Sequence, residues 1–225
     1  MTVDISTDRG IGVDLDAVAA RLEGASASDI VEWAIGTFGR RIAVAASMAD
    51  TVLIDIATKI DPDVEVVFLD TGFHFAETLQ TLRRAQARYR LNVRVERPAA
   101  RTPDLFAVGT DACCAHRKVA LLDRALADKD AWITGLRRAE SAARADAPIV
   151  SYDSRGLVKV CPLAAWSDAD VNRYVADNDI IVNPLQFEGY PSIGCWPCTV
   201  PVLDGSDRRA GRWAGTGKTE CGLHL

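Results

Sequence analysis

Apolar and polar residues alternate along most of the chain in a pattern that predicts an α/β fold. The apolar runs of strand length are 41–45, 65–69, 92–96, 131–134 and 157–161. The stretches with helical spacing between them are 50–59, 77–89 and 117–127. A further helix is expected after Ser167 as N-cap, and two more before the first strand, from about Asp14 and from Ser28 to Gly39.

This alternation of strands and helices predicts a mainly parallel sheet of five to six strands that is buried on both faces. In such folds the ligand site lies beyond the carboxyl ends of the strands, so the loops after Ala45 and Leu69 are candidates. From residue 206 the pattern disappears, and the last twenty residues contain four glycines. We therefore expect one domain over 1–205 and a mobile tail over 206–225.

Composition narrows the class of protein. The 225 residues include 31 acidic and 26 basic ones, a net charge of -5, so no general field would attract nucleic acid or an anionic membrane. No apolar stretch approaches the roughly 18 residues of a membrane helix. The first ten residues lack the features of a secretory signal, so a cytoplasmic location is expected, where the six cysteines would be metal ligands or catalytic thiols.

Four cysteines form two close pairs, Cys113 with Cys114 and Cys195 with Cys198. Two pairs about eighty residues apart suffice for a tetrathiolate metal site, but spacing alone does not distinguish zinc from iron–sulfur. A redox dithiol at the CxxC pair is a weaker interpretation, because it leaves the other pair unused. Cys161 lies in an apolar strand and is interpreted as a core thiol.

Two loops carry candidate nucleotide contacts. In residues 45–51, small side chains, the Ser47 hydroxyl and a helix N-terminus would suit an oxyanion, although a close-packed turn capped by Asp50 fits equally well. In residues 69–74, Asp70 could hold a base or ribose, or could simply form an Asp-Thr-Gly turn. His74 is interpreted as a half-buried loop residue.

Basic residues recur near these loops and cysteines, which indicates a local anion-binding cluster in an acidic protein. They are His116, Arg117, Lys118, Arg137, Arg138, Arg208, Arg209 and Arg212. Near the C-terminus, Cys221 is either an incidental thiol or a mobile nucleophile, with His224 and Lys218 nearby to favour its thiolate.

Taken together, these segments resemble the assimilatory adenylyl-sulfate (APS) reductases of the thioredoxin-dependent, iron–sulfur type, within the PAPS reductase family. The resemblance covers nearly the whole chain. The segments that carry it are Ser47-Met48-Ala49-Asp50, Leu69-Asp70-Thr71-Gly72, Cys113-Cys114-Ala115-His116-Arg117-Lys118, Thr134-Gly135-Leu136-Arg137-Arg138, Cys195-Trp196-Pro197-Cys198, Arg209-Ala210-Gly211-Arg212-Trp213 and Glu220-Cys221-Gly222-Leu223-His224.

The resemblance implies a Rossmann-like adenine nucleotide alpha-hydrolase-type fold, with residues 1–205 binding the nucleotide and an iron–sulfur centre. It also implies that Cys221 is the nucleophile. The implied ligands of a 4Fe-4S cluster are Cys113, Cys114, Cys195 and Cys198. The implied substrate-binding residues are Ser47, Asp70, Lys118, Arg138, Arg209, Arg212 and His224, with the arginine pair 137–138 ambiguous by one position.

The implied reaction is reduction of adenosine 5'-phosphosulfate to sulfite and AMP through an S-sulfocysteine, in sulfate assimilation and cysteine biosynthesis. Thioredoxin or a glutaredoxin-like protein would be the reductant, and a homo-oligomer is left open. One alternative is a reductase of 3'-phosphoadenylyl sulfate (PAPS) or of both substrates. An ATP-using sulfurtransferase or pyrophosphatase is disfavoured by the missing loop glycines. A zinc-stapled binding module is the alternative without catalysis.

Overall fold

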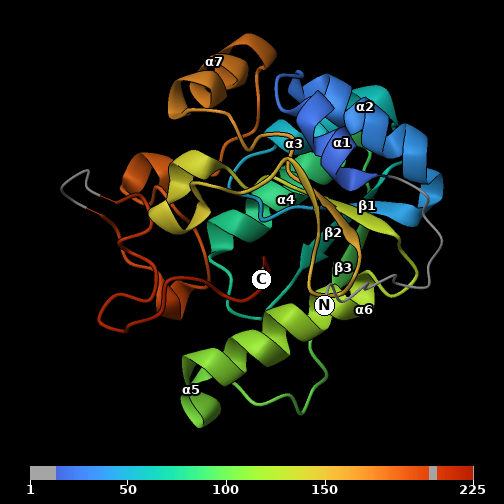
Figure 1. The fold of residues 1–225 in the computed structure, drawn as a ribbon. Coiled ribbons are helices and arrows are strands. Elements are labelled where there is room, and N and C mark those ends of the chain that lie inside the picture. Colours follow the sequence, from blue (N-terminus) through green and yellow to red (C-terminus); the bar gives the residue numbers. More distant parts are fainter. Residues whose placement is uncertain (1–13, 203–206, 225) are drawn as a thin grey trace.

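The computed structural model describes residues 14–202 and 207–224, and its centre is a sheet of six strands (Figure 1). The strands are β1 (Ile42–Ala45), β2 (Glu65–Leu69), β3 (Asn92–Glu96), β4 (Ala131–Thr134), β5 (Val150–Tyr152) and β6 (Val158–Val160). Their order is β3-β2-β1-β4-β6-β5, and every neighbouring pair is parallel except β5 with β6. The prediction of an α/β fold with a mainly parallel sheet is confirmed.

The register of the central strands aligns their carboxyl ends. Ala45 of β1 lies opposite Val67 of β2 and Thr134 of β4. The chain segments that leave β1, β2 and β4 therefore emerge at one edge of the sheet, which is where a ligand site is expected in this architecture.

Helices cover both faces of the sheet. They are α1 (Leu15–Leu22), α2 (Ala27–Phe38), α3 (Val52–Ile60), α4 (Ala76–Tyr89), α5 (Leu105–Cys114), α6 (Ala120–Ala125) and α7 (Asp168–Asn178). Side chains of β1 alternate between the two faces, so Val44 packs in the larger core with α1 to α4 and Ala43 packs in the smaller core with α6. No described helix is both long enough and apolar enough to cross a bilayer.

Several predicted boundaries needed correction. The N-cap of α2 is Ser26 and not Ser28, because Ser26 and Asp29 form a reciprocal capping box. Helix α5 and the short edge strand β5 were not predicted, and the helix predicted over 117–127 is a π-helical turn, Ala115–Val119, followed by α6. The predicted boundary between 205 and 206 lies outside the described residues.

Candidate functional site

A cavity of about 310 Å³ lies at the carboxyl edge of the sheet. Ser47 lines it from the loop after β1, and Thr134 lines it from the end of β4. Its outer wall comes from two later segments, residues 191–195 and 208–224. The cavity therefore forms where the register of the strands places it, and distant parts of the chain close it.

The loop after β1 is held by side chains from elsewhere. Met48 has a φ of 61°, and the buried side chain of Asn183 donates a hydrogen bond to its carbonyl (3.2 Å). Asp50 accepts the Val52 N–H (3.0 Å) and also lines the cavity, where burial raises the pKa of its carboxyl group. Asp50 thus partners the helix N-terminus, and the loop also faces the cavity.

In the loop after β2, the side chain of Asp70 supports the turn. It accepts hydrogen bonds from the Gly72 N–H (3.1 Å) and from Arg97 Nε (3.0 Å), and it does not line the cavity. His74 does line it, with Nε2 2.8 Å from the Leu69 carbonyl oxygen, and burial lowers the pKa of its ring.

The four paired cysteines line one smaller cavity that adjoins the larger one. Cys113, Cys114 and Cys195 are buried, and Cys198 is half-buried. Burial raises the pKa of Cys113 and of Cys198, and the neighbouring thiols raise it further. The structure thus brings together two pairs that are far apart in the sequence.

Backbone pairing fixes the CxxC segment beside the loop after β2. His74 and Cys195 form an antiparallel β-bridge, and the Trp196 N–H donates to the Phe73 carbonyl (2.8 Å). Thr71 Oγ1 lies 3.3 Å from Cys195 Sγ. Thr71 and Cys195 each line both cavities, so the two cavities share a wall.

Lys118 belongs to the same wall. The π-helical turn Ala115–Val119 continues α5 beyond Cys114 and brings Lys118 to line both cavities. Its ammonium group interacts electrostatically with Cys114 and Cys198. Within the two described ranges, no group of three or more His, Cys, Asp or Glu side chains is arranged to hold a metal ion.

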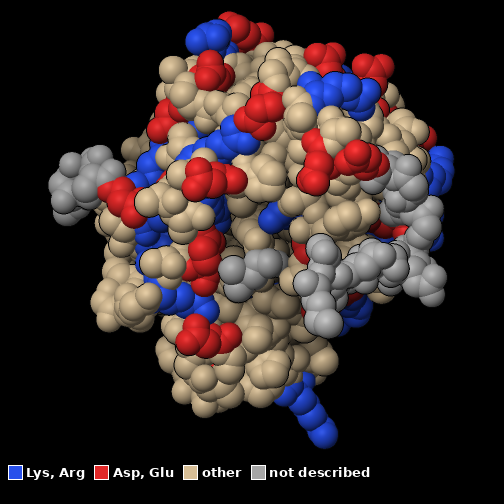
Figure 2. Space-filling model, in the orientation of Figure 1, with Lys and Arg blue, Asp and Glu red and all other residues tan. Residues whose placement is uncertain are grey.

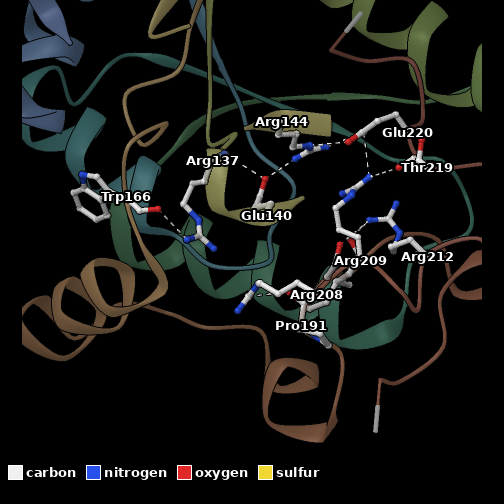
Figure 3. A network of polar contacts seen from close by, with 12 residues as sticks. Arg137, Glu140, Arg144, Trp166, Pro191, Arg208, Arg209, Arg212, Thr219 and Glu220 are labelled. Carbon is white, nitrogen blue, oxygen red and sulfur yellow. Dashed lines mark hydrogen bonds and ion pairs between the residues drawn. The ribbon is translucent and has the colours of Figure 1, made fainter. Parts of the chain in front are cut away.

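Five arginines surround the outer part of the larger cavity, and Figure 3 shows their guanidinium groups arriving from separate segments. They are Arg137, Arg144, Arg208, Arg209 and Arg212. Asp168 accepts from Arg137 Nη2 (2.8 Å) and from Arg208 Nη1 (3.0 Å). Elsewhere on the face drawn in Figure 2, basic and acidic side chains are intermixed. Part of the predicted basic cluster lines this cavity, namely Lys118, Arg137, Arg208, Arg209 and Arg212, whereas His116, Arg117 and Arg138 do not.

Glu220 binds two of these arginines. Its Oε1 accepts from Arg144 Nε (2.7 Å), and its Oε2 accepts from Arg144 Nη2 (2.8 Å) and Arg209 Nη2 (3.1 Å) (Figure 3). Burial raises the pKa of Glu220, but its hydrogen bonds and the positive charges outweigh this and hold the pKa below its ordinary value. Burial lowers the pKa of Arg144, but Glu220 and Glu140 outweigh this and raise it.

Among the described residues, Arg212 is a cation without a carboxylate partner. Its Nη1 donates to Ser192 Oγ (3.2 Å) and to the Ile193 carbonyl (3.3 Å), whereas its Nε is buried and unpaired. Its guanidinium lies 4.5 Å from the Trp213 ring centroid, and burial lowers its pKa. No described Asp or Glu forms an ion pair with it. An anion in the cavity would complete its interactions.

The described part of the C-terminal segment folds against the domain. Leu223 packs on the smaller core, and the His224 ring stacks on Trp132 at 5.8 Å with an interplanar angle of 10°. Lys159 Nζ donates to the His224 carbonyl (3.1 Å), and burial lowers the pKa of the His224 ring to about 3. Cys221 thereby lines the larger cavity, half-buried.

Lys218 and Arg212 both interact electrostatically with the Cys221 sulfur. The ammonium group of Lys218 also forms an ion pair with Asp111 of α5 (2.5 Å). Two described cations therefore act on Cys221, a lysine from its own segment and the arginine without a described carboxylate partner.

Most of the predicted substrate-binding residues, together with the predicted nucleophile, meet at the larger cavity. Those that line it are Ser47, Lys118, Arg209, Arg212, Cys221 and His224. Asp70 does not, and neither does Arg138, which donates to the Ala147 carbonyl (2.8 Å) and forms an ion pair with Glu23 of the α1 C-terminus. Arg137, one position earlier, lines the cavity instead. Cys161 is fully buried, as expected of a core thiol.

Sequence reasoning missed Glu140, Arg144 and Glu220. Arg144 and Glu220 are separated by 76 residues, so no local pattern indicated their contact. The one available signal was the place of Glu220 directly before Cys221 in a recognised segment.

Comparisons with known proteins agree with this geometry. Residues 41–201 match the model of the phosphoadenosine phosphosulfate reductase domain. The chain is 47% identical to the adenosine 5'-phosphosulfate reductase of Rhodococcus opacus, over all of this chain and 99% of that protein. It is also 47% identical to the protein of that name from Mycolicibacterium smegmatis, over 99% of this chain and 98% of that protein.

A solved structure, the phosphoadenylyl-sulfate (PAPS) reductase of Candida auris in a phosphate complex, superposes with a TM-score of 0.73 at 27% identity. The match covers 83% of this chain and 96% of that one. The FMN adenylyltransferase of Candida glabrata, in complex with FAD and inorganic pyrophosphate, has a TM-score of 0.60 at 15% identity, covering 94% and 80%, which shows a shared fold alone.

Proposed function

The chain belongs to the phosphoadenosine phosphosulfate reductase family, and from this premise we propose that it reduces adenosine 5'-phosphosulfate to sulfite and AMP. It is an oxidoreductase acting on a sulfur group. The observation that carries the proposal is Arg212, a cation that no described carboxylate pairs with and that lines the same cavity as Cys221. This pairing supplies a nucleophile and an anion site side by side.

The proposed reaction has two steps. In the first, the Cys221 thiolate attacks the sulfur of the bound phosphosulfate, a sulfur–sulfur bond forms, and the bond to the phosphate oxygen breaks. AMP leaves with that electron pair, and Cys221 becomes an S-sulfocysteine. In the second, a thiolate of the reductant attacks the Cys221 sulfur and expels sulfite. The second thiol of the reductant then resolves the mixed disulfide, so the reductant is oxidised to a disulfide.

The arginines supply the electrostatic part of this reaction. Negative charge grows on the departing phosphate as the first bond breaks, and fixed cations stabilise that charge without having to reorganise. Arg209, Arg212 and Lys118 line the same cavity as Cys221, and the charged groups of all three lie 4.5–5.9 Å from the Trp213 ring centroid. The neutral His224 ring, also in the lining, could donate one hydrogen bond to an anionic oxygen without adding charge.

We further propose that Cys113, Cys114, Cys195 and Cys198 hold a 4Fe-4S cluster. All four thiols line one cavity, and the lining of that cavity contains no carboxylate. This set of donor atoms suits iron–sulfur ligation. When bound, a cluster with four thiolates carries a net charge of about -2 and would supply a fixed negative charge next to Lys118. Lys118 would then be held between that charge and the substrate.

Residues 206–225 are proposed to act as the catalytic tail, with thioredoxin or a related dithiol protein as reductant. For the second step the S-sulfocysteine must become accessible to another protein. The contacts of Leu223 and His224 with the domain must then be released.

The decisive experiment uses protein prepared without oxygen, APS and reduced thioredoxin, with sulfite release as the measurement. Without reductant, APS should add the mass of one SO₃ unit to the peptide that contains Cys221 and release one AMP per chain. PAPS in a parallel reaction tests the alternative substrate, and pyrophosphate release from ATP tests the ATP-using class. A colourless protein that contains zinc and yields neither adduct nor sulfite would contradict the proposal.

A further inference from the structure

The carboxylate of Glu220 occupies guanidinium groups that line the proposed substrate cavity. Its side chain is 19% exposed, and those of Arg144 and Arg209 are each 10% exposed. Both oxygens are used, in a two-point contact with Arg144 and a third bond from Arg209. A charge-assisted contact of this kind, largely shielded from water, is stronger than an exposed ion pair.

The contact lies directly beside the nucleophile. Cys221 follows Glu220, and Gly222 then turns the chain with a φ of 87°. Beyond the turn, Leu223 packs on the smaller core and His224 is held by Trp132 and Lys159. Cys221 is thus suspended between a polar anchor on one side and a mainly apolar anchor on the other.

We propose that Glu220 is the positioning residue that seats Cys221 in the cavity, acting through Arg144 and Arg209. The inference rests on the proposed function only in that Cys221 is the nucleophile. Glu220 itself does not touch the reacting atoms. Its carboxylate is an internal anion that fastens the tail to the same cluster that receives the substrate.

Substrate binding and tail seating are coupled by this arrangement. The anionic substrate and Glu220 would bind the same cluster of guanidinium groups. When the tail is closed, Glu220 therefore neutralises part of the positive charge that the nucleotide encounters. Glu220→Gln keeps the shape of the side chain but removes the charge and the ability to accept at both ends. Nucleotide affinity should therefore stay the same or increase, while attack by Cys221 slows.

The first test needs no nucleotide. In anaerobically prepared protein, iodoacetamide alkylation of Cys221 is followed by peptide mass spectrometry, using the plateau rate at high pH where the thiol is fully ionised. Glu220→Gln should react roughly tenfold faster than wild type, because the loss of the anchor raises the population of the open tail. Glu220→Asp, which keeps the charge, should lie between them.

Asp111→Asn is the matched control. Asp111 also joins the body of the protein to the tail, through Lys218, but its side chain is 89% exposed. Exposed ion pairs contribute little, so this variant should alkylate at a rate within about twofold of wild type. Equal alkylation rates in Glu220→Gln and wild type would contradict the proposal that Glu220 positions Cys221 in the cavity.

The second test is single-turnover AMP release from APS without reductant, together with equilibrium binding of AMP. Glu220→Gln should release AMP at least roughly tenfold more slowly, with the dissociation constant for AMP unchanged or lower. Loss of AMP affinity in parallel with the rate would overturn the positioning role, because Glu220 would then shape the whole pocket. If wild type itself releases no AMP, the proposed function fails. The alkylation test still decides whether Glu220 positions Cys221.

Discussion

In the sheet, Val44, Ile133 and Val160 are fully buried among apolar side chains, whereas guanidinium groups and thiols are enclosed in the segments that cover its carboxyl edge. We call those segments, residues 105–119, 183–202 and 207–224, the rim. The sheet is held by apolar burial, which depends on volume and pattern and tolerates exchange among similar side chains. The rim is held by particular donors and acceptors, each of which needs its own partner.

This difference separates stability from chemistry. Ile133→Val in the sheet removes one buried methylene group and should lower the free energy of unfolding by about 0.5–1.5 kcal/mol. Activity per folded molecule should not change, because Ile133 does not line the cavity. Substitutions in the rim should show the reverse pattern, and the following predictions, from the largest effect to the smallest, test it.

Cys221→Ser should abolish sulfite formation, because a serine hydroxyl is not ionised near neutral pH and cannot replace the thiolate. Binding of AMP, iron content and melting temperature should match those of wild type. The check is intact-protein mass spectrometry after incubation with APS. An SO₃ adduct on Cys161 or on a CxxC cysteine, or sulfite at the normal rate, would mean that the rim does not carry the nucleophile.

Cys114→Ser should lose most of its iron and its brown colour, whereas Cys161→Ser should keep both. Both cysteines are buried, but only Cys114 lines the four-thiol cavity, while Cys161 belongs to the larger core. Iron and sulfide analysis per chain gives the result, with about four of each expected in loaded wild type. Unchanged iron content in Cys114→Ser would contradict the assignment of Cys114 as a cluster ligand.

Arg212→Ala should lower kcat/KM for APS by one to two powers of ten, since a lost charge-assisted contact costs about 1.5–3 kcal/mol. Arg209→Ala should show a loss of similar size. Gly194→Ala should resemble Arg212→Ala, because a Cβ at that position would overlap the Arg212 guanidinium.

Gly36→Ala is the control for the glycine. Gly36 lies within α2, and a Cβ there meets nothing within 4 Å. The change should raise stability by roughly 0.5–1 kcal/mol and leave kcat/KM unchanged. Full activity in Gly194→Ala at sub-saturating APS would show that the position of Arg212 is not critical.

The smallest effect concerns pH. The pKa of docked His224 is about 3, against an ordinary value of 6.5, so between these values the undocked tail binds a proton that the docked tail does not. Docking is therefore most stable above pH 6.5 and weakens as pH falls below it. The melting temperature of wild type, compared with that of His224→Asn, should lose its advantage of a few degrees between pH 7.5 and 5.5. A constant difference would mean that the ring does not titrate on release.

The same division explains how much the sequence could predict. Strand 131–134 was predicted at its true bounds because a short run of this kind, rich in apolar side chains, is typical of a buried strand. Helix α5 was missed because Gly109, with a φ of 75°, interrupts its helical pattern. Strand β5 was missed because three residues at a sheet edge carry too little pattern.

The four cysteines and Cys221 were selected from the sequence because their residue type carries unusual chemistry, whereas Lys118 was selected because its segment resembles that of the family. Which of the adjacent residues Arg137 and Arg138 lines the cavity could not be predicted from the sequence. Adjacent arginines have the same chemistry, and only the fold directs one of them to the cavity and the other to Glu23. The Arg144–Glu220 pair likewise depends on how distant segments meet.

The backbone bridge between His74 and Cys195 couples the loop after β2 to the cysteine pocket. One cysteine of the proposed metal-binding set is paired directly with the loop that leaves β2, so we expect a disturbance of the cysteine pocket to displace a wall of the larger cavity. We therefore expect a newly made chain to bind nucleotide only after the proposed metal centre has formed. Chains in which the centre has not formed, or has been lost to oxygen, would then be inactive and would not bind nucleotide in the cell.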